Sequence, residues 1–92
     1  MNVTMFTRTP CPRCDATKRR LKDTPFTPID VDVDEAAGDE LRRRGYTSLP
    51  VVRVTDAEGN VVDEWSGFNP GKVDAARALV EASFTKAAQV AA

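Results

Sequence analysis

The 92-residue sequence predicts one α/β domain in which the elements follow the order β-α-β-α-β-β-α. Three observations lead to this prediction. Two strand-like runs are separated by an amphipathic stretch, which is the order of a parallel βαβ unit with a right-handed crossover. Two later strand-like runs are joined by a short turn, the pattern of an antiparallel hairpin. Because helical stretches follow both parts, we expect a four-stranded mixed sheet flanked by three helices.

The first strand is expected over residues 2–6, NVTMF, because this run is rich in strand-forming residues. A helix follows over residues 12–22, and Pro12 suits its first position because the proline ring fixes φ near the helical value. Within that helix, residues at spacings of three and four form one stripe that we expect to face inward. The stripe consists of Cys14, Thr17 and Leu21.

A second strand is expected over residues 27–32, where apolar residues alternate with aspartates. The alternating apolar residues are Ile29, Val31 and Val33. Asp34 is a suitable N-cap for a second helix that continues to Arg44, and Gly45 is a suitable residue to end it. The pattern therefore predicts a strand and a helix that carry the chain across the sheet.

Residues 51–55 and 61–65 read VVRVT and VVDEW, and the five residues DAEGN between them contain a glycine, as expected for a hairpin. Pro70 begins the last predicted helix. The apolar face of this helix consists of Val73, Ala76, Val80, Phe84 and Ala87. We place the domain at residues 1–87 and expect a frayed tail over residues 88–92.

The composition excludes several classes of protein. A formal net charge of −1 argues against a general nucleic-acid binder, which would carry a basic excess. No apolar run approaches the roughly 18 residues of a membrane span, and the N-terminus lacks the pattern of a secretory signal. We expect a cytoplasmic monomer with neither nucleic acid nor membrane as a partner. In that compartment a permanent disulfide is unusual.

Both cysteines, Cys11 and Cys14, lie at the start of the first predicted helix. Thiol–disulfide exchange needs an exposed thiolate and a second sulfur close enough to displace it. The N–H groups and dipole at the helix start favour a thiolate at Cys11, and Arg8, Arg13 and Lys18 add positive charge. In such surroundings the pKa of a thiol falls to about 3.5–7.5. We predict Cys11 as the nucleophile and Cys14 as the resolving thiol.

Other roles remain open for the pair. A structural metal usually needs four ligands, and the sequence has no second cysteine pair and no histidine. An iron–sulfur cluster shared between two subunits would take one pair from each. The thiols could also be inert, although Cys11 between two prolines is poorly placed for burial. A disulfide serving only as a staple would contribute just about 2 kcal/mol across so short a loop.

Further motifs accompany the C-x-x-C pair: CDATKRR at its second cysteine, SLPVV before the hairpin, and WSGF after it. A C-x-x-C at a first helix with a later Leu-Pro resembles the thioredoxin and glutaredoxin superfamily, which implies a thioredoxin-like fold. More narrowly, the three motifs resemble the NrdH-redoxins. These are small glutaredoxin-like proteins that supply electrons to class Ib ribonucleotide reductase. The resemblance covers residues 2–80.

The resemblance implies a binding groove for a substrate chain. Pro50 would be a cis-proline that faces the two sulfurs, since proline lowers the cost of a cis bond. The backbone of Ser48 and Leu49 would offer strand-like hydrogen bonds to the substrate. A further segment would lie beside Cys11 and shape the groove for a partner: Trp65, Ser66, Gly67 and Phe68. Trp65 is also interpretable as an ordinary core residue.

The resemblance implies a dithiol electron carrier as the leading function. Thioredoxin reductase would reduce the Cys11–Cys14 disulfide with electrons from NADPH. The reduced chain would then reduce ribonucleotide reductase or another protein that carries a disulfide. No cofactor or metal ion beyond the redox-active disulfide is expected.

Two alternatives accompany this hypothesis. The chain could be a glutaredoxin-type oxidoreductase that uses glutathione or another small thiol, with Arg8 in the place of the usual glutaredoxin lysine. However, the paired glycine and the aspartate that hold glutathione in glutaredoxins are absent, because Asn69, Pro70 and Gly71 follow WSGF. The second alternative is a non-catalytic module that binds an iron–sulfur cluster.

Overall fold

The computed structural model describes the backbone of residues 1–91 and the side chains of residues 1–83. Within this part of the chain, the strands are β1 (Asn2–Thr7), β2 (Thr27–Asp30), β3 (Val51–Thr55) and β4 (Val61–Ser66). The helices are α1 (Pro12–Leu21), α2 (Glu35–Arg43) and α3 (Pro70–Ala91). The elements follow one another in the predicted order.

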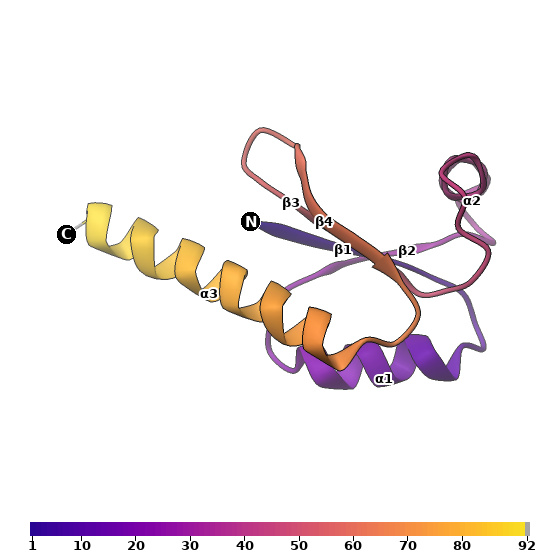
Figure 1. Ribbon diagram of the computed structural model, residues 1–92, viewed down its shortest axis with the longest axis horizontal. Helices are drawn as coiled ribbons and strands as arrows, with labels where there is room; N and C mark the ends of the chain where they lie inside the picture. Colours follow the sequence, from indigo (N-terminus) through magenta and orange to yellow (C-terminus); the bar gives the residue numbers. More distant parts are fainter. Residues whose placement is uncertain (92) are drawn as a thin grey trace.

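The strands form one mixed sheet with the order β2-β1-β3-β4. β1 and β2 are parallel, whereas β3 is antiparallel to both β1 and β4. In Figure 1, α1 and α3 lie together below the sheet, and α2 lies on its other side. The prediction of a four-stranded mixed sheet flanked by three helices is therefore confirmed.

The larger hydrophobic core lies between the sheet and the layer of α1 and α3. Alternate residues of β1 and β3 point into it, as the two-residue period of a strand requires. Its buried members are Val3, Met5, Cys14, Leu21, Val52, Val54, Trp65, Val73, Ala76 and Val80. The predicted inward stripe of α1 is confirmed, because Cys14, Thr17 and Leu21 are each at most 1% exposed. One of the two cysteines is thus part of the core.

A smaller core lies on the opposite face of the sheet, under α2. It consists of Phe6, Ala37, Leu41 and Val51. Asp34 caps α2 as predicted, since its carboxylate accepts a hydrogen bond from the N–H of Ala37 at 3.1 Å. Gly45 follows the end of α2 with a φ of +89°, a conformation that favours glycine. These contacts hold α2 close to the start of β3.

The second strand is two residues shorter than the sequence predicts. β2 ends at Asp30, whose carbonyl oxygen accepts hydrogen bonds from the N–H groups of Val33 and Asp34 at 3.1 and 2.8 Å. The Asp30 carboxylate also accepts one from the N–H of Asp32. These bonds close a turn that competes with strand pairing. Val33, the last apolar residue of the alternating pattern, therefore lies outside the strand and is 83% exposed.

The last helix, α3, carries the predicted apolar face through Val73, Ala76 and Val80, all of which are buried. The side chains of Phe84 and Ala87, predicted on the same face, lie outside the described residues. The division into a domain of residues 1–87 and a frayed tail of residues 88–92 stays a prediction. Among the described residues, no helix is both long and apolar enough to span a membrane.

Candidate active site at the start of α1

Cys11 occupies the N-cap of α1, and Pro12 is the first residue of the helix. The backbone of Cys11 is extended, and its carbonyl oxygen accepts a hydrogen bond from the N–H of Asp15 at 3.0 Å. The N–H of Cys14 donates to Sγ of Cys11 at 3.2 Å. A sulfur thus takes the position that a serine or aspartate oxygen usually has in a helix cap. Because the first N–H groups of a helix carry partial positive charge, this position favours an anionic sulfur.

Cys11 and Cys14 form a disulfide, with their Cα atoms 5.2 Å apart. The two residues differ strongly in exposure. Cys14 is 1% exposed and belongs to the larger core, whereas Cys11 is partly exposed at its edge. An incoming thiolate can therefore approach the sulfur of Cys11 and is blocked from that of Cys14.

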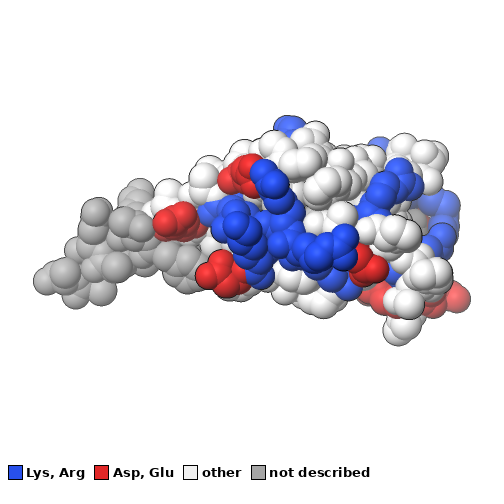
Figure 2. Space-filling view, turned by 90° about the horizontal axis from the view of Figure 1, so that it is seen from below, with Lys and Arg blue, Asp and Glu red and all other residues white. Residues whose placement is uncertain are grey.

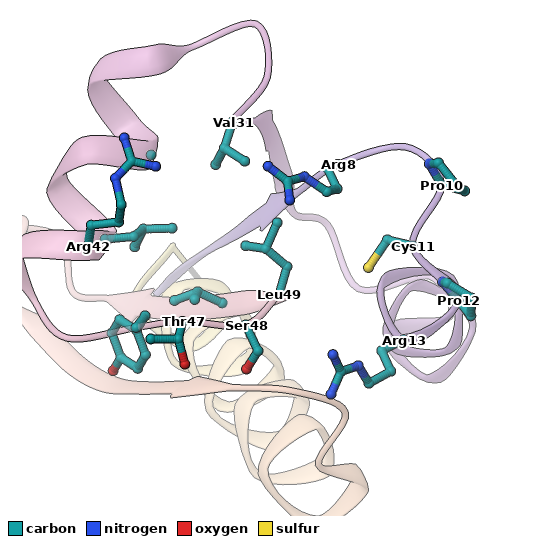
Figure 3. Close-up of a pocket in the computed structure, with 14 residues that line it drawn as sticks. Arg8, Pro10, Cys11, Pro12, Arg13, Val31, Arg42, Thr47, Ser48 and Leu49 are labelled. Atoms are coloured by element: carbon teal, nitrogen blue, oxygen red, sulfur yellow. The ribbon is translucent and has the colours of Figure 1, made fainter.

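A groove of about 580 Å³ begins at Cys11. Residues 10–13 line one side of it, and the segment 46–49 before β3 lines another. Leu41 and Arg42 of α2 also line it. Figure 3 shows the sulfur of Cys11 on the side of the α1 start that faces Leu49. The groove is open, so an extended peptide or a small disulfide has access to this sulfur.

Pro50 joins the segment that lines the groove to β3. The Leu49–Pro50 peptide bond is cis, and Pro50 is fully buried directly before β3. Its carbonyl oxygen accepts a hydrogen bond from the N–H of Gly67 at 2.8 Å. Gly67 has a φ of +82°, which glycine adopts without strain. The hydrogen bond joins the segment after β4 to the segment that lines the groove.

Only some of the residues predicted to bind a partner line the groove. Ser48 and Leu49 line the groove together with Arg8, but none of the residues from Trp65 to Phe68 does. Trp65 is 7% exposed and belongs to the larger core, and its Nε1–H has no hydrogen-bond partner among the side chains and backbone groups that the structure describes. Ser66 and Phe68 are exposed. The role of this segment in partner binding stays a prediction.

Three arginines line the groove: Arg8, Arg13 and Arg42. Arg8 pairs with Asp32 at 3.0 Å, and Arg42 pairs with Asp39 of the same helix. Arg13 has no ion pair with any described side chain. The positive charge near Cys11 is therefore partly compensated within the chain, and Arg13 is the arginine left available for an anionic ligand.

The sequence did not predict several of the residues that line the groove. Pro10, which follows a cis peptide bond, Val31 and Thr47 had no predicted role in the site. Tyr46 also lines the groove. Pro10 lies in the connection from β1 to α1, whereas Val31, Tyr46 and Thr47 lie in the segments that flank α2. No local motif signals this placement.

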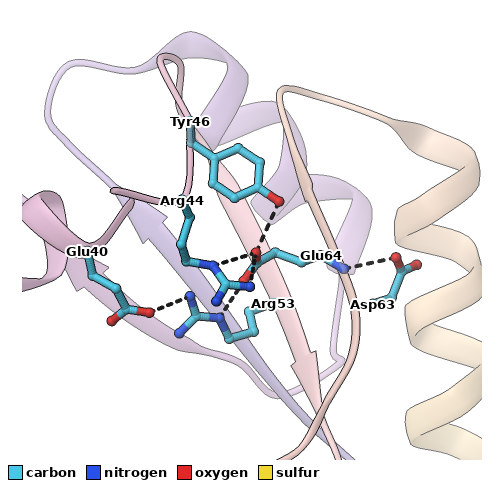
Figure 4. A network of polar contacts seen from close by, with 6 residues as sticks. All are labelled: Glu40, Arg44, Tyr46, Arg53, Asp63 and Glu64. Carbon is cyan, nitrogen blue, oxygen red and sulfur yellow. Dashed lines mark hydrogen bonds and ion pairs between the residues drawn. The ribbon is translucent and has the colours of Figure 1, made fainter. Parts of the chain in front are cut away.

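A polar network behind the groove fixes Tyr46 (Figure 4). The carboxylate of Glu64 on β4 accepts hydrogen bonds from Tyr46 Oη at 3.0 Å, from Arg44 and from Arg53. Arg53 also pairs with Glu40 of α2 at 2.9 Å. Burial opposes ionisation of Glu64, but the hydrogen bonds from the two arginines and Tyr46 outweigh it and lower its pKa. Burial, with the hydrogen bond to Glu64, raises the pKa of Tyr46. The network therefore holds a neutral tyrosine against a charged carboxylate.

Comparisons with known proteins agree with this site. The sequence model of the glutaredoxin family matches residues 3–58. The glutaredoxin-like protein NrdH of Salmonella typhimurium is 37% identical over 76 residues, which are 80% of this chain and 86% of the relative. The protein of the same name from Escherichia coli K12 matches with the same identity and coverage.

Solved structures give the same result. The E. coli NrdH-redoxin superposes with a TM-score of 0.71 at 37% identity, over 80% of this chain and 92% of that one. A thioredoxin of Malassezia sympodialis superposes with a TM-score of 0.60 at 24% identity, over 84% and 71% of the two chains, and shows the fold alone. The thioredoxin-like fold is confirmed. The chain therefore belongs to the NrdH glutaredoxin-like proteins of the glutaredoxin family and is a small thiol–disulfide oxidoreductase.

Proposed function

We propose that this chain is a dithiol electron carrier between thioredoxin reductase and protein disulfides, with class Ib ribonucleotide reductase as the leading target. Cys11 is the nucleophile and Cys14 the resolving thiol. The observation that carries the proposal is the position of Cys11. Its sulfur caps α1, accepts the N–H of Cys14 at 3.2 Å, and opens onto the groove, while Cys14 is buried.

The reductive half of the cycle begins at the exposed sulfur. A thiolate of the reductase attacks Sγ of Cys11, a mixed disulfide forms, and Cys14 leaves as a thiolate that takes up a proton. A second thiol of the reductase then attacks its own sulfur in the mixed disulfide and releases Cys11. Two electrons and one proton have entered the chain, which now holds a thiol at Cys14 and a thiolate at Cys11.

The second half reverses these steps on the target. The Cys11 thiolate attacks a disulfide sulfur of the target, and one target sulfur leaves. Cys14 then attacks Sγ of Cys11, which reforms the internal disulfide and releases the target as a dithiol. The helix N-terminus favours the Cys11 thiolate as nucleophile and as leaving group, so one electrostatic feature supports both halves.

We place the binding site for the target chain at segment 46–50. Among the described residues, no hydrogen bond engages the backbone of Ser48 or Leu49, so their polar groups are available to an extended peptide. The cis Leu49–Pro50 bond lies directly beside them, and Leu49 faces Cys11 across the groove. A target disulfide held there would lie next to the attacking sulfur.

The comparisons support thioredoxin reductase as the reductant. The E. coli NrdH-redoxin, which matches over 80% of this chain, is described by its "thioredoxin-like activity profile". By analogy with thioredoxins, we assign thioredoxin reductase to this chain as its source of electrons. We further propose a cytoplasmic location, a monomeric state, and no cofactor beyond the disulfide.

A glutathione-dependent oxidoreductase is the second candidate. The arginines that line the groove are the observation in its favour, because guanidinium groups suit the carboxylates of a small anionic thiol. Arg8 and Arg42 are already paired with aspartates, which weakens this case.

A coupled assay separates the two candidates. The purified disulfide form is mixed with NADPH and either thioredoxin reductase or glutathione with glutathione reductase, and NADPH oxidation is followed with insulin disulfides as acceptor. We expect rapid oxidation only with thioredoxin reductase. Cys11→Ser, which lacks the nucleophile, is the control and should fall to the background rate. Rapid oxidation only in the glutathione mixture would reject the carrier and favour the second candidate.

A further inference from the structure

Positive charge accumulates on the exposed face of α1. Figure 2 shows Lys and Arg side chains merging into one surface on the side of the molecule where α1 and α3 lie. The exposed cations of α1 and its C-cap are Arg13, Lys18, Arg19, Arg20 and Lys22, and Asp15 is the one acidic residue of the helix. We call the four without an ion pair to a described side chain the α1 cationic ridge: Arg13, Lys18, Arg19 and Lys22.

The ridge does not reflect a basic composition. The chain has a formal net charge of −1. Residues 23–41 hold acidic side chains and no basic one: Asp23, Asp30, Asp32, Asp34, Glu35, Asp39 and Glu40. The molecule is therefore electrically polarised, with the excess cations on α1. A long polyanion would meet this acidic segment as well, so the charge pattern favours a short acidic ligand over nucleic acid.

Only some of the cations on α1 stabilise the helix. Cations in the last turn interact favourably with the helix dipole, and Arg20 joins α1 to α3 through Asp74 at 2.7 Å. Arg13, however, lies in the first turn, where the dipole disfavours a cation. Lys18 and Lys22 are like charges at positions i and i+4, which repel each other. The position of Arg13 and the Lys18–Lys22 repulsion are therefore not explained by the stability of the helix.

The ridge begins at the active sulfur. Cys11 caps the helix that carries the ridge, and Arg13 lines the groove itself. At a rise of about 1.5 Å per residue, Lys18 and Arg19 lie about 10–12 Å along the helix from Cys11. An extended chain advances about 3.3 Å per residue. A side chain about three to five positions from a target cysteine at Cys11 would therefore reach these two cations.

We propose that the α1 cationic ridge is the docking surface for an acidic segment that flanks the disulfide of the protein reduced by this chain. The proposal rests on the electron-carrier function above and deepens it by giving the target a chemistry. Aspartate or glutamate residues about three to six positions from the target cysteine pair with the ridge while the disulfide lies at Cys11. Opposite charges then raise the rate of encounter and orient the target along α1.

The test uses the reduced full-length chain and two synthetic peptides that share one internal disulfide. The acidic peptide carries four glutamates on each flank, beginning at the third position from the cysteine, and the neutral peptide carries glutamines there. Formation of the peptide dithiol is followed by chromatography at low and high salt. At low salt the acidic peptide should be reduced about tenfold faster than the neutral one, and high salt should remove most of this advantage.

Matched variants assign the effect to the ridge. Arg19→Glu should reduce the rate advantage of the acidic peptide by about threefold, as expected for one charge of the ridge. Arg43→Glu makes the same change at an exposed position of α2 outside the ridge and should leave that advantage in place. The double variant Lys18→Gln/Arg19→Gln, which adds no negative charge to the helix end, should also lower the advantage.

Each outcome bears on a different claim. Equal rates for the two peptides at low salt would overturn the docking proposal and leave the carrier function standing. Equal loss in Arg19→Glu and Arg43→Glu would also overturn it, because the effect would then follow net charge and not the ridge. If neither peptide is reduced, while dithiothreitol reduces both, the proposed function itself fails together with the docking surface.

Discussion

The N–H of Cys14 donates a hydrogen bond to Sγ of Cys11 at 3.2 Å, so the proposed resolving residue also holds the sulfur of the proposed nucleophile. Cys14 can do this because it lies one turn into α1 and is buried in the larger core. Its amide is therefore fixed, whereas Cys11 remains partly exposed. The rigid partner is thus the one that sets the position of the reactive one.

This geometry predicts an acidic thiol at Cys11 in the reduced chain. The cap amides favour the thiolate, so we expect the pKa of the Cys11 thiol to lie below the ordinary value of about 8.5. The rate of iodoacetamide alkylation is measured against pH on the native reduced protein. The midpoint of this pH profile should lie below the ordinary pKa. Mass spectrometry should place the label on Cys11 and leave Cys14 unmodified. A midpoint at or above the ordinary value would contradict the role of Cys11 as a thiolate nucleophile.

Cys14→Ser should convert the carrier into a trap. Without the resolving thiol, Cys11 still attacks a target disulfide, but the mixed disulfide is no longer released from within the chain. We expect one covalent adduct per chain with a peptide disulfide, visible by mass spectrometry under non-reducing conditions, and loss of turnover. Cys11→Ser should form no adduct. Full turnover of Cys14→Ser with glutathione would instead support a monothiol route.

The local signals in the sequence were sufficient for the fold and for the cysteine pair. Runs rich in β-branched residues predict the strands, and Pro12 after Cys11 predicts the start of a helix. In contrast, the groove wall depends on tertiary packing: Arg42, Tyr46 and Val31 reach it because Leu41 anchors α2 on the sheet. Local patterns do not encode such distances. Local patterns therefore predict the exposed Cys11 and segment 48–49 of the groove, but not the part of its wall that α2 supplies.

The network at Glu64 was missed for a related reason. Arg53 and Glu64 are cross-strand neighbours in the β3–β4 ladder, which has an irregularity at Val54 and Thr55. Their pairing follows from the register, and the register of a hairpin with an irregularity is not fixed by the turn alone. Opposite charges at facing positions are a signal only after the register is known.

Glu64→Gln should destabilise the fold. The Glu64 side chain is 7% exposed, and Arg53, which is 16% exposed, would lose its buried counter-charge. Arg53 would then keep only the more exposed Glu40, and Arg44 would lose its ion pair, so we expect a loss of about 2 kcal/mol in the free energy of unfolding. Urea denaturation measures this loss. Glu40→Gln removes a more exposed partner of the same arginine and should cost less than about 1 kcal/mol. Equal costs would show that burial of Glu64 is unimportant.

The contribution of Glu64 should disappear in acid. Its pKa is lowered in the folded state, since the hydrogen bonds from Arg53, Arg44 and Tyr46 outweigh the effect of burial, so the unfolded chain binds its proton more readily. A lowered carboxyl pKa stabilises the fold above the unfolded value, about 4.3, and this stability is lost as the pH falls through the folded value. The difference in unfolding free energy between wild type and Glu64→Gln should thus be largest near neutral pH and shrink below about pH 4. If this difference in unfolding free energy grew on acidification, it would contradict a lowered pKa of Glu64 in the folded state.

Asp32→Asn should increase the reactivity of the groove toward small anions. Asp32 pairs with Arg8 at 3.0 Å, and both side chains are about half exposed. Without that carboxylate, Arg8 is free to interact with an anion in the groove next to Cys11. We expect oxidised glutathione to react a few-fold faster with the reduced variant at low salt, and the gain to fade as salt screens the charges. Stopped-flow measurements give these rates.

The control for this change is Asp63→Asn, which removes a carboxylate from the Lys72–Asp63 pair. Neither member of that pair lines the groove, so the rate with oxidised glutathione should stay at the wild-type value. If the rate with oxidised glutathione rose equally in both variants, the effect would come from net charge and not from Arg8. A gain in Asp32→Asn alone would mean that this chain holds its arginine away from glutathione-like ligands by an internal ion pair. The proposed preference for thioredoxin reductase would then have a physical cause that a single carboxylate controls.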